Sequence, residues 1–148
     1  MSEVRGDGIS ELPCKAEAIV EGYLYKVDSS ASYRMTKATA VNNVISGVAV
    51  ESSLDAIGDA KTLTAGETAL FYNPGCGKVV KVAAITGLTL HRDAPLYAAP
   101  TASGSYMVST SSSDSAQKIG HYKGSEGLVT TADGDLIDVL LDVPIGGS

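Results

Sequence analysis

Apolar residues along the chain come in short runs that glycine, serine, threonine and aspartate interrupt. The runs are rich in valine, isoleucine, leucine and tyrosine, a composition typical of strands. None has the spacing and length of a helix that could pack through one apolar face, and residues 52–60 could hold one helical turn at most. The runs that we expect to form strands are 18–27, 33–36, 44–50, 68–72, 78–82, 95–98, 103–110, 117–122 and 135–143.

This series of about eight to ten short strands with turn residues between them predicts an all-β fold, either a small β-barrel or a β-sandwich. The last run is apolar at nearly every position except Asp138 and Asp142. It therefore predicts a strand buried on both faces, with Leu140 in the core, where an aspartate would unfold the domain.

Two segments of the chain, 45–70 and 118–137, echo each other. In each, a strand with a central glycine is followed by a loop, and the loop ends in a Gly-acid step that begins another strand. This echo indicates either two related hairpin units or ordinary turn chemistry, and the sequence leaves both interpretations open.

The first residues differ from the rest of the chain. Residues 1–15 contain Gly6, Gly8 and Pro13 and show no apolar periodicity, so we predict an extended N-terminal arm, which is either disordered alone or ordered against a neighbour. Residues 16–148 are expected to form a single β-domain, because a chain of this length can bury a core without metal or disulfide support.

Composition and charge narrow the classes of partner. The 148 residues are 44% hydrophobic but only 5% aromatic, which suits a thin β-structure filled by small side chains. The net charge of −6 and the scattered Lys and Arg residues predict no direct contact with nucleic acid. No apolar run approaches the roughly 20 residues of a membrane-spanning helix. Residues 1–13 are polar and acidic, so we expect no signal peptide and a cytosol-like site of synthesis.

One stretch suggests a phosphate-binding loop. Residues 72–80, YNPGCGKVV, contain the Gly-Lys pair of the P-loop, but Tyr72 stands where that motif needs its first glycine. Val79 stands where the motif needs serine or threonine, and the residues after it favour a strand. We therefore interpret the stretch as a strand, a tight Asn-Pro-Gly turn and a second strand that together form a hairpin.

Other short motifs do not predict an enzyme. His91-Arg92-Asp93 begins like the protein-kinase catalytic loop but lacks its downstream asparagine. Arg5-Gly6-Asp7 matches the integrin-binding triplet, and we interpret it as a chance match. His91 and His121 are the only histidines, and no catalytic motif surrounds them, so we expect no catalytic residue, no metal site and no cofactor.

The cysteines and tyrosines do not establish a disulfide, a metal site or a binding face. Cys14 and Cys76 lack the spacing of a zinc site, and free thiols are expected, although a disulfide between them stays open. The tyrosines could line a sugar-binding face, but packing in a core or an interface is their commoner use. They are Tyr23, Tyr25, Tyr33, Tyr72, Tyr97, Tyr106 and Tyr122.

The order of these elements resembles a known family. From about residue 16 to residue 145 the chain runs through IVEGYLYKV, ISGVAV, TAGETALFY, GKVVKV, AAITGLTL, APLYAA, QKIGHY and DGDLIDVLL. In this order it resembles the small head decoration proteins of tailed phages, the capsid cement family. The N-terminal arm, Cys14 and Cys76 depart from the family pattern, and the family supplies no role for them.

The resemblance implies a structural protein of the bacteriophage virion. Such a protein is made in the host cytoplasm and binds the major capsid protein on the outside of the expanded icosahedral head. It often does so as a homotrimer, and it stabilises the head against the pressure of packaged DNA. The main alternative is a carbohydrate- or receptor-binding β-module of a virion appendage, and a small β-barrel enzyme that uses His91 or His121 is a third.

Within this interpretation the arm is the expected interface. We expect residues 1–15 to contact the capsid or a neighbouring subunit, so that their deletion weakens shell binding while the β-domain stays folded. The arm residues that we single out are Arg5, Asp7, Ile9 and Leu12.

Overall fold

The structure is a computed structural model, and it describes residues 3–4, 7–40, 43–99, 106–112 and 116–144. Within these residues the single helical element is the 3-10 turn η1 (Ser29–Ala31), and the rest of the regular structure is strand, so the predicted all-β fold is confirmed. The strands are β1 (Glu3–Val4), β2 (Ile9–Pro13), β3 (Leu24–Asp28), β4 (Arg34–Lys37), β5 (Gly47–Ala49), β6 (Thr68–Tyr72), β7 (Val79–Ala84), β8 (Thr89–Leu90), β9 (Pro95–Ala98), β10 (Val108–Ser109), β11 (Lys118–Tyr122), β12 (Leu128–Val129) and β13 (Asp135–Leu140). Within the described ranges no helix has the length and apolar character needed to cross a membrane.

Strands β1 to β6 form an N-terminal body. Its six-stranded sheet has the order β1-β2-β6-β5-β3-β4, and neighbouring strands are antiparallel. The sheet curls back on itself, because Cys14, directly after β2, forms a parallel bridge with Met35 of β4. The side chains that this body buries form one cluster: Cys14, Ile19, Tyr25, Met35, Ala49, Leu63 and Phe71.

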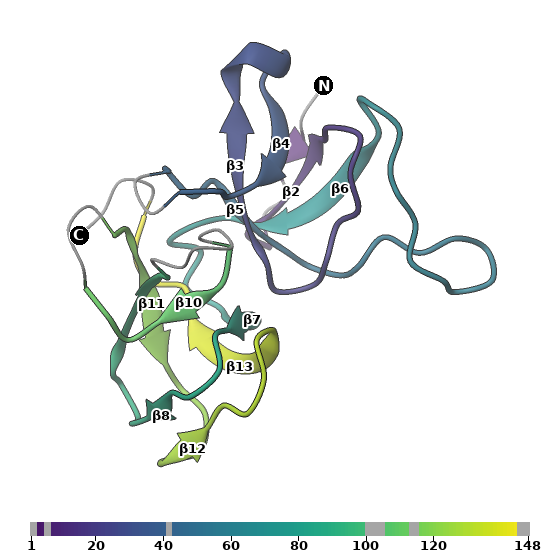
Figure 1. The fold of residues 1–148 in the computed structure, drawn as a ribbon. Coiled ribbons are helices and arrows are strands. Elements are labelled where there is room, and N and C mark those ends of the chain that lie inside the picture. Colours follow the sequence, from purple (N-terminus) through teal and green to yellow (C-terminus); the bar gives the residue numbers. More distant parts are fainter. Residues whose placement is uncertain (1–2, 5–6, 41–42, 100–105, 113–115, 145–148) are drawn as a thin grey trace.

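Strands β7 to β13 form a C-terminal body. Five of its strands close a barrel in which β10, β7, β13, β11 and β9 follow one another. Only β10 and β7 pair in parallel within this barrel. Strands β8 and β12 form a separate two-stranded ribbon at the end of the barrel that lies farthest from the N-terminal body (Figure 1). Of the two predicted architectures, the barrel is therefore the one that this body adopts.

The two bodies are held together by hydrogen bonds and by a shared core. Gly22 lies between them: its N–H donates to the carbonyl of Ala49 in β5 (3.0 Å), and its carbonyl accepts from the N–H of Ala83 in β7 (2.9 Å). A second buried cluster contains side chains of both bodies, and packing across it removes apolar surface of both from water. Its largest members are Leu24, Ile45, Val48, Leu90, Leu96, Tyr122, Ile137 and Leu141.

The two echoing segments form equivalent strand pairs. Strand β5 pairs with β6 in the first body, and β11 pairs with β13 in the second, both antiparallel. The turn before the later strand is closed in the same way in each pair. Glu67 accepts hydrogen bonds from the N–H and the hydroxyl of Thr64, both at 2.7 Å, and Asp135 accepts them from the N–H (2.8 Å) and the hydroxyl (3.4 Å) of Thr131. This shared contact favours two related units.

The predicted N-terminal arm needs a correction. Residues 9–13 are extended, as expected, but they form β2 in the middle of a sheet and pair with all of β6. Ser10 and Cys14 are buried. The sequence hides this because the polar residue Ser10 occupies a buried position and the partner strand lies about sixty residues away. The folded body therefore begins before residue 16.

Three local predictions were also wrong. In β13, Ile137 and Val139 are buried, Leu136 is 41% exposed and Leu140 is only half-buried, so one face of the strand meets the core rather than both. Residues 52–60 form a hairpin instead of a helical turn. The strands that flank the Asn-Pro-Gly turn are β6 and β7, as predicted, but they belong to different sheets and do not form a hairpin.

Candidate functional site

The three predicted interface residues that the structure describes, Asp7, Ile9 and Leu12, do not form a separate arm. Arg5 lies outside the described residues. Asp7 is exposed, and its carboxylate accepts a hydrogen bond from the N–H of Ile9 at 3.2 Å. Ile9 and Leu12 are half-buried in β2, opposite Tyr72 and Ala69 of β6. Leu12 packs against the cluster of the N-terminal body, so part of its role is structural.

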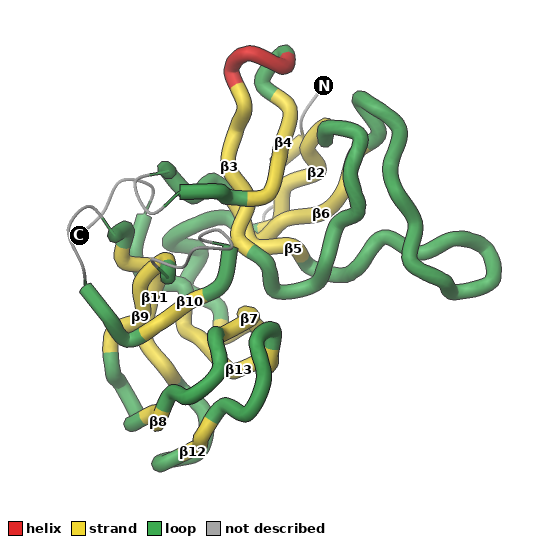
Figure 2. The backbone as a smooth tube through the Cα atoms, viewed as in Figure 1, coloured by secondary structure: helices red, strands yellow, loops and turns green. Residues whose placement is uncertain are grey.

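The most prominent surface feature is the long connection between β5 and β6, which extends away from both bodies (Figure 2). Residues 53–61 of this connection form what we call the projecting hairpin. The N–H of Lys61 donates to the carbonyl of Ser53 (3.0 Å), and Leu54 forms an antiparallel bridge with Ala60. At the tip, the Asp55 carboxylate accepts the N–H groups of Ile57 (2.9 Å) and Asp59 (3.0 Å). These contacts lower the pKa of Asp55.

The base of the projecting hairpin is fixed to the N-terminal body. The N–H of Ser53 donates to the carbonyl of Ile19 (2.8 Å), and the hydroxyl of Ser53 accepts from the N–H of Ile19 (3.0 Å). The Ser52 hydroxyl accepts from the N–H of Glu21 (3.0 Å). The hairpin is therefore a hydrogen-bonded element rather than a loose loop. It presents Leu54, 55% exposed, and Ile57, 86% exposed, to solvent.

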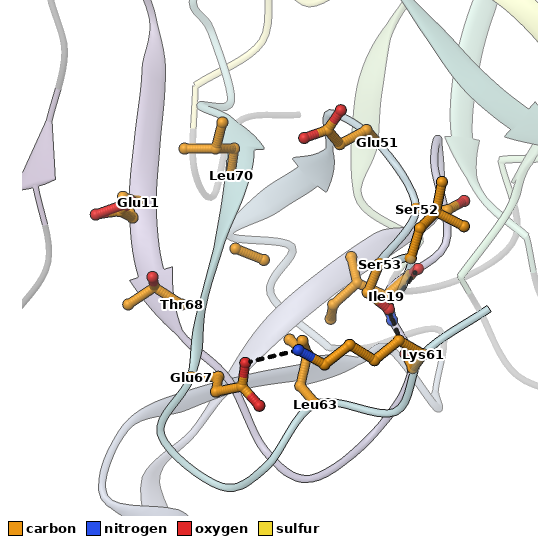
Figure 3. Close-up of a pocket in the computed structure, with 12 residues that line it drawn as sticks. Glu11, Ile19, Glu51, Ser52, Ser53, Lys61, Leu63, Glu67, Thr68 and Leu70 are labelled. Atoms are coloured by element: carbon orange, nitrogen blue, oxygen red, sulfur yellow. Dashed lines mark hydrogen bonds and ion pairs between the residues drawn. The ribbon is translucent and has the colours of Figure 1, made fainter. Parts of the chain in front are cut away.

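A groove of about 280 Å³ runs beside the base of the hairpin, between the hairpin and β6 (Figure 3). Its apolar wall includes Ile19, Leu54, Leu63 and Leu70. The volume is near the lower limit of small-molecule sites, which hold about 300–1,000 Å³. We call the groove together with the exposed side chains of the projecting hairpin the hairpin face.

The hairpin face is acidic. In Figure 3, Glu51 lies at one end of the groove, and Glu67 lies at the other end, paired with Lys61 at 3.3 Å. The N–H and the hydroxyl of Thr64, followed by Lys61, lower the pKa of Glu67 to about 2. Glu51 is exposed, and among the described residues it has neither an ion pair nor a side-chain hydrogen bond. With Asp55 and Asp59 at the tip, negative charge outweighs Lys61 on this surface.

The two histidines lie at separate carboxylates. His91 contacts Glu126 at 2.6 Å, and His121 contacts Asp142 at 2.8 Å. The His91 contact and the N–H of Arg92 lower the pKa of Glu126. Across the described residues, no group of three or more His, Cys, Asp or Glu side chains is placed to hold a metal ion.

Both cysteines are free thiols. Cys14 is buried in the N-terminal body, and burial raises the pKa of its thiol to about 12. Cys76 is half-buried and follows the turn that links the two bodies.

The tyrosines do not line a common face. Tyr25 and Tyr122 are fully buried, whereas Tyr33 is 71% exposed at the end of the β3–β4 hairpin. Tyr23 and Tyr106 are half-buried, with ring centroids 4.6 Å apart, and the Lys37 ammonium lies 4.2 Å from the centroid of Tyr106. This cation–π contact uses one ring face inside the protein itself.

Comparison with protein-family models, with curated proteins and with solved structures finds no match to this chain. The choice of the hairpin face as the candidate site therefore depends on its geometry and charge alone. Sequence reasoning missed it because Leu54 and Ile57 are isolated apolar residues in a polar segment. The available signal was Asp55-Ala56-Ile57-Gly58-Asp59, because an aspartate whose side chain can accept nearby backbone N–H groups and a glycine three residues later are typical of a turn.

Proposed function

We propose that this protein is a structural virion protein that binds the outer surface of an icosahedral capsid, through the major capsid protein, and stabilises the shell. The order of its sequence elements, which resembles the capsid cement family, supports this function. The structural observation that carries the proposal is the projecting hairpin, because it holds two aliphatic side chains in solvent on a fixed backbone.

The physical reason is that such a hairpin is prepared for contact with another protein. Complete burial of an aliphatic side chain contributes about 1.5–3 kcal/mol. Leu54 and Ile57 retain most of that gain for a partner, since most of their surface is exposed. The hydrogen bonds that fix the hairpin also reduce the entropy lost when it binds. Many copies on one shell would add these contacts over the whole particle.

Cosedimentation with shells tests the function directly. Purified protein is mixed with expanded, undecorated capsids of the source virus, and bound protein is measured over a range of concentrations. We expect saturable binding at a fixed ratio to the major capsid protein and a higher temperature of shell disruption in the decorated particles. Folded protein that does not bind the shells would refute a decoration role.

Self-association is the second part of the proposal. We expect a homotrimer, as the resemblance implies, and multi-angle light scattering of the free and shell-released protein measures its mass. A monomer in both states would leave shell binding intact as a function and would exclude the trimer.

A carbohydrate- or receptor-binding module of a virion appendage is the second candidate, and the Tyr23–Tyr106 pair is the observation that favours it. Sugar rings stack on aromatic faces, and Lys37 beside the pair offers hydrogen-bond donors. Glycan-array binding that is lost in Tyr106→Ala, with shell binding absent, would favour this module over a decoration protein.

A further inference from the structure

We propose that the hairpin face is the surface through which this protein docks on the shell, and that its occupant is a basic, aliphatic segment of the major capsid protein. This inference rests on the proposed function and specifies its interface. It moves the docking surface from the N-terminal residues to the connection between β5 and β6.

The aliphatic part of the occupant follows from the shape of the surface. Ile57 and Leu54 project from the hairpin, and Leu63 and Leu70 line the groove at its base. Leu63 is already buried, whereas Leu70 is half-buried, so the groove offers partly covered apolar surface that a side chain of another protein can cover. Leu54 belongs both to the hairpin and to the groove lining. Apolar surface of this kind that polar residues border is typical of protein-binding sites.

The basic part of the occupant follows from charge. Glu51 and Glu67 border the groove, and Asp55 and Asp59 lie at the tip. Lys61 is the cation among the groove residues, and it is already paired with Glu67. A segment with lysine or arginine next to its aliphatic side chains would place positive charge against the exposed Glu51 carboxylate, and complementary charge speeds and orients docking.

A second copy of this chain is the less suitable occupant. If the hairpin of one copy entered the groove of another, Asp55 and Asp59 at its tip would approach Glu51 and Glu67, and like charges at an interface oppose binding. Measuring whether the hairpin variants still self-associate therefore distinguishes a second copy of this chain from the major capsid protein as the occupant of the hairpin face.

The shell experiment compares two matched double variants. Leu54→Ser with Ile57→Ser removes the projecting aliphatic side chains, and Leu128→Ser with Val129→Ser removes exposed aliphatic side chains of β12 in the C-terminal body. Circular dichroism and thermal melting verify that both are folded. We expect the hairpin variant to bind undecorated shells about tenfold more weakly or worse than wild type, and the β12 variant to bind as wild type does. Glu51→Lys should weaken binding and reduce its dependence on salt.

These results separate the two proposals. Wild-type protein that fails to bind shells overturns the decoration function. Wild-type binding that the hairpin variants retain overturns the docking surface and leaves the function in place. Trimers or dimers that dissociate in Leu54→Ser with Ile57→Ser, without a change in shell affinity per subunit, would assign the hairpin face to a second copy and overturn the proposed occupant.

A peptide experiment tests the occupant without shells. The probe is a ten-residue peptide of alternating lysine and leucine, and the control peptide has glutamate in place of lysine. We expect the lysine peptide to shift the amide resonances of Leu54, Ile57 and Leu70 in the ¹⁵N-labelled protein, with the shifts lost in Glu51→Lys. Shifts spread over the whole acidic surface, or equal shifts with the glutamate peptide, would overturn a basic occupant at this site.

Discussion

Replacing Gly22 by alanine is expected to weaken the junction between the two bodies. Gly22 has a φ of +81°, and a Cβ atom there would lie 2.5 Å from Cδ2 of Leu136 and 2.8 Å from the backbone nitrogen of Ala83. Leu136 is partly exposed and can turn away, but Ala83 is fixed in β7, whose residues pair with β13. Relief of the contact therefore has to move Gly22, and that movement disturbs its hydrogen bond with the N–H of Ala83.

The expected cost comes from three effects. The left-handed backbone costs a residue with a Cβ about 1–2 kcal/mol. Overpacking against a fixed backbone costs about 1–3 kcal/mol. Loss of the hydrogen bond adds about 1 kcal/mol. The sum of about 3–6 kcal/mol is a large part of the roughly 5–15 kcal/mol by which a domain is stable.

Gly127→Ala is the matched control. Gly127 has a φ of +79°, almost the same as Gly22, but a Cβ atom there would meet nothing within 4 Å. Only the backbone cost of about 1–2 kcal/mol should remain. Urea unfolding followed by circular dichroism gives the free energy of unfolding of both variants and of wild type. Equal losses in the two variants would refute the reasoning, because the contacts of Gly22 would then contribute nothing.

Three further predictions concern the fold. Val139→Asp should unfold the protein, because it places a charge in the core, whereas Leu140→Asp should be tolerated better, since Leu140 is half-buried. Thermal melting measures both variants, and a lower melting temperature for Leu140→Asp would contradict this prediction. Deletion of residues 1–15 removes β2 and Cys14 and should prevent folding, whereas deletion of residues 1–7 retains β2 and should not; proteolysis and circular dichroism distinguish the two. The hydrogen bonds that lower the pKa of Glu67 stabilise the folded protein while the carboxylate is ionised, and this stabilisation is lost as pH falls from about 4.5 to about 2. The melting temperature of Glu67→Gln should therefore fall less steeply than that of wild type in this pH window.

Strand positions were predictable where the strand is determined by its own composition. Residues 68–72 and 95–98 are β6 and β9 with the predicted bounds. In β6, Thr68, Phe71 and Tyr72 favour a strand, and in β9 the run Leu96-Tyr97 follows a proline at the first strand position, where proline is tolerated. The run 18–27 was only partly right, since β3 begins at Leu24. Ile19 and Gly22 before it make contacts with the projecting hairpin and with β7, and local composition carries no information about such partners.

The candidate site depended on contacts that the sequence does not reveal. The hydroxyl of Ser53 closes the base of the projecting hairpin by donating to the carbonyl of Lys61, and it joins the hairpin to a distant segment by accepting from the N–H of Ile19. The groove exists because that hairpin stands beside β6, so no residue in it has a distinctive pattern of its own. Conversely, residues 1–15 lack apolar periodicity although residues 9–13 form a strand inside a sheet, because the polar residue Ser10 occupies a buried position there.

The equivalent strand pairs suggest how the projecting hairpin can serve as a docking element. In the second unit the chain between β11 and β13 is short and returns along the ribbon of β8 and β12, whereas in the first unit the corresponding connection extends away as the hairpin. The same threonine–acid contact closes both connections, at Thr64 with Glu67 and at Thr131 with Asp135, so the chain enters the later strand through the same turn in both units. Connecting segments on a fixed scaffold tolerate change, so residues 54–60 of this connection can carry binding residues, while Ser53 and Leu63 hold the connection to the N-terminal body.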